Sequence, residues 1–206
     1  MGRADRYARR NVTASDTTEI PSGKLRMVIT YLEMRARPSH GPGHLPAGIK
    51  AALLRAENPT VSLYRYLYNT VGEPWLWYER RAFDDATLAD IIQDPKVEIY
   101  VLYVGGVPAG YGELDRRTES EIELAYFGLM PEFIGKGLGR YFLTWIVDAA
   151  WRYEPERLWV HSCNFDHPEA LRAYQRAGFM PYGQEALIVD DPRLSGLIPS
   201  HVEVRA

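Results

Sequence analysis

The sequence predicts a mixed α/β fold in one domain, and three features carry this prediction. Two strand-like runs, residues 97–104 and 109–114, flank Gly105 and Gly106, a two-glycine turn of the kind that joins antiparallel strands. Residues 137–152 place apolar side chains at helical spacing, which predicts a helix that buries one stripe. The chain has 206 residues, which is enough for one well-buried core and too few for two full domains.

The other elements follow in chain order. Residues 25–34 are rich in β-branched and apolar side chains and lie between breakers, so they predict the first strand. Residues 38–46 hold too many prolines and glycines for regular structure, and helices are predicted at 62–70 and 84–94. The remaining predictions are strands at 122–130 and 158–163, a helix opened by Pro168 and ended by Gly178, and further strands in the tail 186–204.

Charge and composition exclude several classes of protein. Lys and Arg total 24 against 27 acidic residues, a net charge of −3, so a nucleic-acid partner is not expected. No apolar run is long enough to span a membrane. Residues 1–22 lack the apolar core of a secretory signal, and we interpret them as a flexible tail before one domain at 23–206. Cys163 is the one cysteine, which excludes a disulfide framework and a multi-cysteine metal site. We expect a cytoplasmic protein without a metal ion.

The most distinctive stretch is residues 127–140, where an apolar run breaks into a turn containing Gly135, Gly137 and Gly139 and then enters an amphipathic segment. This order predicts a strand, a phosphate-binding loop and a helix, because backbone N–H groups at a helix start bind anionic oxygens. The spacing fits neither a P-loop, which needs Ser or Thr after the lysine, nor the dinucleotide fingerprint, which needs glycine where Arg140 stands. The glycines could instead serve only a tight turn and close helix packing.

A second pattern lies at residues 164–179. Its characteristic residues are Asn164, Ala170, Tyr174, Gly178 and Phe179. Together with the glycine loop, it resembles the acetyl-CoA signature of the GCN5-related N-acetyltransferase (GNAT) superfamily. The resemblance covers residues 25–190 and is most specific over 121–179. Two departures are Ile134, where the family usually has Gln or Arg, and a longer spacing between the asparagine and the alanine of the second pattern.

The resemblance implies a central twisted, mostly antiparallel sheet with helices on both faces and a splayed strand pair that binds acetyl-CoA. Backbone N–H groups at Phe127 and Leu129 would bond the thioester and the pantetheine arm. Lys136 and Arg140 would neutralise the pyrophosphate, unless they are only solvated cations at a helix start. The implied cofactor-binding residues are Phe127, Gly128, Leu129, Gly135, Lys136, Gly137, Leu138, Gly139, Arg140 and Asn164.

Acyl transfer to an amine needs a group that takes the amine proton and a group that protonates the departing thiolate. Glu123 is the predicted general base, because strand alternation places it on the face of Ala125 and Phe127 and because related enzymes have a Glu at the matching place. Glu121 shares this face as a rival, and either could be a solvated strand-edge acid. The resemblance implies that Tyr174 protonates the thiolate, whereas its alternative role is that of a core aromatic.

His161 and Cys163 lie two residues apart on one predicted strand and could form a thiol–imidazole pair. A small buried thiol beside a satisfied histidine is the commoner arrangement. No covalent step is needed if the amine attacks the thioester directly.

An aromatic cluster precedes the central hairpin. Trp75, Trp77 and Tyr78, together with Tyr31, form the predicted acceptor pocket, where ring faces could hold an apolar amine or a cation. A core seal or a homodimer contact is the open alternative.

The predicted function is therefore N-acetyl transfer from acetyl-CoA to a primary amine, by direct attack in a ternary complex. We expect a small-molecule or peptide acceptor and no nucleic-acid or membrane partner. A noncatalytic acyl-CoA sensor and an interaction domain with a structural glycine loop are the alternatives.

Overall fold

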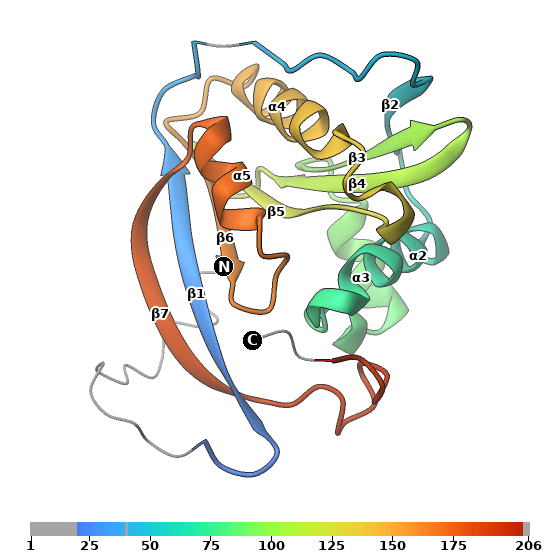
Figure 1. Ribbon diagram of the computed structural model, residues 1–206, viewed down its shortest axis with the longest axis vertical. Helices are drawn as coiled ribbons and strands as arrows, with labels where there is room; N and C mark the ends of the chain where they lie inside the picture. The colour runs from blue at the N-terminus through green and yellow to red at the C-terminus, as the bar shows by residue number, and fades with distance from the viewer. Residues whose placement is uncertain (1–19, 40, 204–206) are drawn as a thin grey trace.

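The computed structural model describes residues 20–39 and 41–203, which form a seven-stranded sheet in the order β2-β3-β4-β5-β6-β1-β7 (Figure 1). Neighbouring strands in this part of the chain run antiparallel except β5 and β6, which run parallel. The mixed α/β fold with a mostly antiparallel sheet is confirmed. The strands are β1 (Lys24–Met34), β2 (Ala51–Arg55), β3 (Val97–Val104), β4 (Val107–Asp115), β5 (Glu121–Leu129), β6 (Arg157–Cys163) and β7 (Met180–Asp190).

Helices cover both faces of the sheet, as predicted (Figure 1). On one face, α4 and α5 bury Leu143 and Tyr174 in a cluster with Leu124 of β5. On the other face, α2 and α3 bury Leu67 and Leu88. The helices are α2 (Val61–Gly72), α3 (Asp85–Ile92), α4 (Leu138–Trp151) and α5 (Ala170–Ala177), with short 3-10 helices η1 (Glu73–Trp75), η2 (Glu79–Ala82) and η3 (Pro131–Phe133).

The predicted elements are present within two residues of their expected bounds, apart from three differences. The sequence does not predict β2, because the run Ala51–Arg55 has no alternation of apolar and polar residues. The last helix begins at Ala170, so Pro168 precedes it and does not occupy its first turn. Of the strands expected in the C-terminal tail, β7 extends to Asp190, and residues 191–203 contain none.

The first strand, β1, is the second strand from one edge of the sheet, between β6 and β7 and antiparallel to both. Its register sets Tyr31 opposite His161 of β6. Met27 and Ile29 of the same strand pack with Ile198 and Val202 from the end of the described chain. The C-terminal segment therefore packs against the N-terminal strand.

Residues 1–19 of the predicted tail lie outside the described residues, so the division into a tail at 1–22 and a domain at 23–206 stays a prediction. Among the described residues, no helix combines the length and the apolar composition that crossing a membrane requires.

A buried ion pair joins η2 to the sheet. The Arg80 guanidinium lies 2.6 Å from a Glu113 carboxylate oxygen, and the two side chains are 5% and 0% exposed. The Tyr64 hydroxyl donates to the second oxygen of Glu113. Burial by itself would lower the pKa of Arg80, but the adjacent Glu113 charge outweighs it and the pKa is raised. This pair holds η2 against the sheet. Tyr78 and Glu79, at the start of η2, line the site described below.

We expect Arg80→Ala to lower the free energy of unfolding by about 3–5 kcal/mol, because Glu113 would keep a buried charge without its partner. Urea titration followed by circular dichroism measures this. Arg172→Ala is the matched control, because Arg172 pairs with Glu169 where both side chains are at least half exposed, and it should cost less than about 1 kcal/mol. Equal losses for the two variants would contradict a stabilising role for the buried pair.

Candidate active site

A pocket opens where β5 and β6 separate. The two strands pair only from Glu121 opposite Arg157 to Glu123 opposite Trp159, and beyond this point no register joins them in the described chain. The pocket has a volume of about 280 Å³ and is lined by residues from both faces of the sheet. The splayed strand pair expected from the sequence is therefore present, and the pocket runs through the gap between its strands.

A β-bulge in β5 changes which side chains face which way. Glu113 pairs with Tyr126 and Leu114 with Leu124, which leaves Ala125 without a partner on β4. Ala125 and Tyr126 both pack in the α2 cluster, whereas Phe127 packs against Phe142 of α4 with ring centroids 5.1 Å apart. The expectation that Glu123 and Phe127 share a face is therefore wrong. The bulge adds one residue to the strand and reverses its alternation.

The glycine turn forms the start of α4. Gly135 and Gly137 have φ angles of 79° and 76°, which favour glycine, and a Cβ on Gly135 would meet nothing within 4 Å. Gly137 occupies the N-cap position and no described side chain caps the helix, so the first-turn N–H groups have no side-chain acceptor. Gly135 and Gly139 line the pocket. The turn thus offers backbone donors at the edge of open space.

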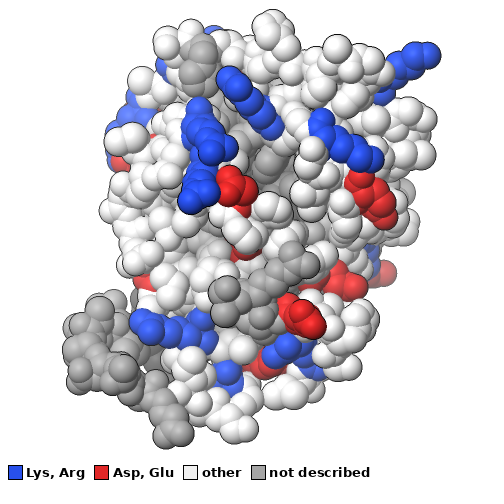
Figure 2. Space-filling view, in the orientation of Figure 1, with Lys and Arg blue, Asp and Glu red and all other residues white. Residues whose placement is uncertain are grey.

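The other residues of the predicted cofactor set divide into two groups. Phe127, Gly128 and Leu129 of β5 line the pocket, as does Ile134 beside the turn. The remaining members do not line it: Lys136, Gly137 and Arg140 are exposed, Leu138 is buried in an apolar cluster, and Asn164 is exposed. Figure 2 shows Lys and Arg side chains in the upper half of the view, where α4 and α5 lie in Figure 1, and a further group near its lower edge.

The side chain of Asn164 is engaged by β1. Its Oδ1 accepts from the backbone N–H of Val28 at 2.7 Å, and its Nδ2 donates to the carbonyl of Arg26 at 3.2 Å. Two residues further on, Asp166 lines the pocket and accepts from Trp77 Nε1 at 3.0 Å, Ser162 Oγ at 2.8 Å and the Cys163 backbone N–H at 3.0 Å. Asn164 therefore shapes the loop, and the loop presents Asp166 to the pocket, followed by His167.

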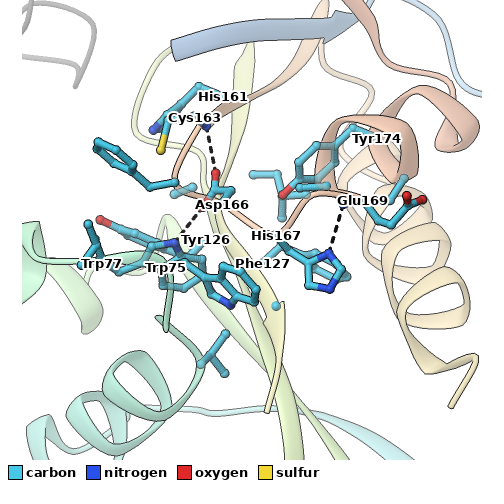
Figure 3. A pocket seen from close by; sticks show the side chains of 18 of the residues that line it. Trp75, Trp77, Tyr126, Phe127, His161, Cys163, Asp166, His167, Glu169 and Tyr174 are labelled. Carbon is cyan, nitrogen blue, oxygen red and sulfur yellow. Dashed lines mark hydrogen bonds between the residues drawn. The ribbon is translucent and has the colours of Figure 1, made fainter. Parts of the chain in front are cut away.

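Tyr174 projects from α5 toward the gap between the strands (Figure 3). The residue is 7% exposed, and no described group hydrogen-bonds its hydroxyl. Its ring is held edge-on against Phe179 with centroids 5.9 Å apart. Burial and then the negative charge of Asp166 raise the pKa of Tyr174 well above its ordinary value. The phenol is thus a neutral proton donor in the pocket.

Glu123 lies behind His161. The carboxylate oxygen Oε1 of Glu123 is 3.2 Å from Nδ1 of His161, and the two side chains are 6% and 26% exposed. Oε1 has no hydrogen bond of good geometry among the described residues. His161 lines the pocket, whereas Glu123 does not. The rival Glu121 pairs instead with Arg157 at 3.3 Å. Of the two carboxylates that the sequence left as alternatives, Glu123 is thus the one in contact with a pocket-lining side chain, His161.

The predicted acceptor residues are brought together across the gap. Trp75 ends η1 and lies edge-on to His167 with ring centroids 5.0 Å apart, and the Trp77 indole bonds Asp166 (Figure 3). The Tyr31 ring lies 6.2 Å from that of His161. All of these residues line one pocket together with Tyr78.

Comparison with known proteins places this arrangement in a family. The model of the acetyltransferase (GNAT) family matches residues 61–179, from the start of α2 to the residue before β7. The chain belongs to the GNAT acetyltransferase family. A search of curated proteins finds no match to this GNAT chain.

Solved structures share the GNAT fold at low sequence identity. A GCN5-related N-acetyltransferase from Sphaerobacter thermophilus is 17% identical with a TM-score of 0.53, over 79% of this chain and 50% of that one. A putative GNAT acetyltransferase from Novosphingobium aromaticivorans is 17% identical with a TM-score of 0.53, over 85% of this chain and 71% of that one. An IAA acetyltransferase from Bacillus cereus is 20% identical with a TM-score of 0.51, over 65% of this chain and 79% of that one. The GNAT chain described here thus spans half the length of the Sphaerobacter protein.

Within this GNAT chain, the thiol–imidazole pair considered from the sequence does not form. Nδ1 of His161 faces Glu123, and burial together with the nearby Asp166 charge raises the pKa of Cys163 to about 12. Cys163 is therefore a neutral thiol and a poor nucleophile. In the part of the chain that the structure describes, no cluster of three His, Cys, Asp or Glu side chains could hold a metal ion.

Proposed function

We propose that the protein moves an acetyl group from acetyl-CoA to a primary amine by direct attack within a ternary complex. One observation carries this proposal: a single pocket passes through the gap between β5 and β6. It joins the glycine turn and Tyr174 on one side to His161 and the aromatic cluster on the other. Two ligands that enter from opposite faces of the sheet would meet in this gap, where a proton donor and a proton acceptor are already present.

The residues of the turn fit coenzyme A. The uncapped start of α4 offers backbone donors to a pyrophosphate, and the space beside Gly135 leaves room for it. Lys136 and Arg140 are exposed at the same helix start, where they would meet the phosphates from solvent. Beyond Glu123, the edge of β5 that faces β6 has no strand partner among residues 20–39 and 41–203, so backbone groups near Phe127 and Leu129 would hold the pantetheine arm. The bound thioester supplies the acetyl group.

The protein's own groups then handle two protons. Glu123, predicted as the base, reaches the pocket through His161, because Nδ1 of that ring faces Glu123 and leaves Nε2 to accept a proton from the amine, directly or through water. The new N–C bond forms as the C–S bond breaks. Tyr174 supplies a proton to the departing thiolate, since burial keeps its phenol protonated. Each proton and each electron pair thus has a destination.

Calorimetry with coenzyme A tests the ligand, and thiol release from acetyl-CoA with a panel of amines tests the reaction. Binding without thiol release for any amine would favour the noncatalytic sensor. No binding by folded protein would favour an interaction domain in which the glycine loop is structural.

A charge placed in the turn sharpens the binding test. Gly135→Asp should weaken coenzyme A binding by about tenfold or more, because the added carboxylate would repel the pyrophosphate while meeting no neighbour within 4 Å. Gly105→Asp is the matched control, since Gly105 also has a positive φ and open space but lies in the β3–β4 turn. Equal effects of the two variants on the calorimetric Kd would argue against a phosphate site at the turn.

A further inference from the structure

A side-chain hydrogen bond crosses the gap between the two splayed strands. Nε1 of Trp77, in the segment between η1 and η2, donates to Oδ1 of Asp166 at 3.0 Å, and Asp166 lies in the loop between β6 and α5 (Figure 3). In the described chain, backbone pairing joins β5 to β6 only as far as Glu123. Trp77 and Asp166 therefore connect the two sides of the gap at a place where the strands themselves do not pair.

The indole of Trp77 is packed closely on the β5 side. A Cβ added to Gly72, the last residue of α2, would overlap Cε3 of the indole, so the ring fills the space that a side chain there would take. A Cβ on Gly128 of β5 would lie 3.7 Å from Cη2 of the same ring. The ring centroids of Tyr68 and Tyr126 lie 5.6 and 5.2 Å from that of Trp77. The indole thus has a defined position between the end of α2 and β5.

Asp166 can hold the indole because both of its carboxylate oxygens accept hydrogen bonds. Oδ1 accepts from the Trp77 indole, whereas Oδ2 accepts from the Ser162 hydroxyl at 2.8 Å and from the backbone N–H of Cys163 at 3.0 Å. An asparagine has one acceptor oxygen and would turn its NH2 group toward either the indole N–H or the Cys163 N–H, and both of these only donate. The carboxylate therefore ties the indole to the end of β6.

The two ends of this connection carry groups that the proposed reaction uses. Gly128 stands between Phe127 and Leu129, whose backbone would hold the pantetheine arm. The loop that contains Asp166 leads into α5, which carries Tyr174, and burial followed by the Asp166 charge raises the pKa of that phenol. The separation between β5 and this loop would therefore set the distance from the bound thioester to its proton donor.

Resting on the proposed function, we propose that Trp77 is a positioning residue and that Asp166 holds it in place. The indole fixes the width of the gap between β5 and the β6–α5 loop, so that the thioester faces Tyr174 when the amine attacks. Trp77 itself neither takes nor gives a proton. Loss of the indole bond should slow the chemical step, because reacting groups must be held within a narrow range of distances.

Hydrogen exchange in Trp77→Phe tests the connection without an activity assay. The variant keeps an aromatic ring beside Gly72 but loses the N–H that Asp166 accepts. We expect amide exchange at residues 127–129 and 164–167, on the two sides of the gap, to become at least about threefold faster than in the wild type. Exchange in the β3–β4 hairpin should stay unchanged.

Ser162→Ala is the matched control, because it removes a hydrogen bond from the same carboxylate but leaves the indole bond in place. Ser162 is buried and does not line the pocket. We expect this variant to speed exchange in the loop 164–167 and to leave residues 127–129 unchanged. Unchanged exchange at 127–129 in Trp77→Phe, or equal acceleration there in both variants, would overturn the connection across the gap.

Kinetics then separate positioning from a purely structural role. The substrate is the amine of the panel that gives the fastest thiol release, used at saturation because Trp77 also lines the pocket. Trp77→Phe should lower kcat about tenfold, while the calorimetric Kd for coenzyme A changes less than about threefold. Asp166→Asn should lower kcat in the same way, and Ser162→Ala should not. An unchanged kcat for Trp77→Phe, or an equal loss of affinity for coenzyme A, would overturn the positioning role.

The wild-type protein distinguishes failure of this inference from failure of the proposed function. Absence of thiol release with every amine would overturn acetyl transfer and the positioning role with it, whereas faster exchange at residues 127–129 in Trp77→Phe would still support the connection across the gap. Thiol release by the wild type together with an unchanged kcat for Trp77→Phe would leave acetyl transfer standing and remove the role of Trp77.

Discussion

Replacing Tyr174 with Phe should lower kcat for acetyl transfer about 10²–10³-fold, the range of a lost general acid. The phenol lines the pocket from α5 and is the general acid that we propose, and the variant keeps the ring that packs against Phe179. The calorimetric Kd for coenzyme A should change less than about twofold, since only one hydroxyl is removed. Because the pKa of Tyr174 is raised, the donor stays protonated through the neutral and mildly alkaline range, and the wild-type rate should not fall there through loss of this proton.

Tyr182→Phe is the control for this experiment, because Tyr182 lies on β7, is 49% exposed and does not line the pocket. Pre-steady-state measurement of the acyl-transfer step is the decisive readout, since slow product release could mask a slower chemical step. A Tyr174→Phe enzyme with an unchanged acyl-transfer rate would leave Tyr174 as a core aromatic only.

Replacing His161 with Asn should lower kcat/KM about 10²–10³-fold, because the side chain that we propose takes the amine proton is lost. Glu123→Gln should lower it less, about tenfold, since the imidazole remains in the pocket and loses only the charge that orients it. The loss for Glu123→Gln should be largest near neutral pH, and affinity for coenzyme A should stay nearly intact.

The double variant distinguishes a relay from two independent groups. If Glu123 acts through His161, the double variant should be no slower than His161→Asn alone, because the second change removes a partner that no longer has a function. Multiplied losses would show that the two residues act separately. An unchanged rate for Glu123→Gln would remove that carboxylate from the mechanism.

Local patterns predicted much of this protein. The hairpin around Gly105, the helix starting after the glycine turn and the strand ends all follow from periodicity and breakers, which act within a few residues. The C-terminal end of α5 at Gly178 is another such case, because its φ of 108° needs glycine. The clustering of Tyr31 with Trp75 and Trp77 is also as predicted.

Features that depend on distant pairing could not be predicted in the same way. The bulge at Ala125 arises from the register with β4, and no local residue pattern marks it. The approach of His161 to Glu123 depends on the short parallel pairing of β5 with β6. Asp166 could have been suspected as the second acidic or amide side chain in a short loop after a strand, but its partner Trp77 is far away in sequence.

The short pairing of β5 with β6 has a mechanical consequence. In the described chain, three residue pairs form the whole seam between a β2-to-β5 half-sheet and a β6-β1-β7 half-sheet. A pantetheine chain lying against β5 in the gap would contact both half-sheets and restrict their motion relative to each other. Binding of coenzyme A should therefore make the sheet more rigid at this seam. Amide hydrogen exchange along β5 beyond Glu123 should slow by more than exchange in the distant β3–β4 hairpin.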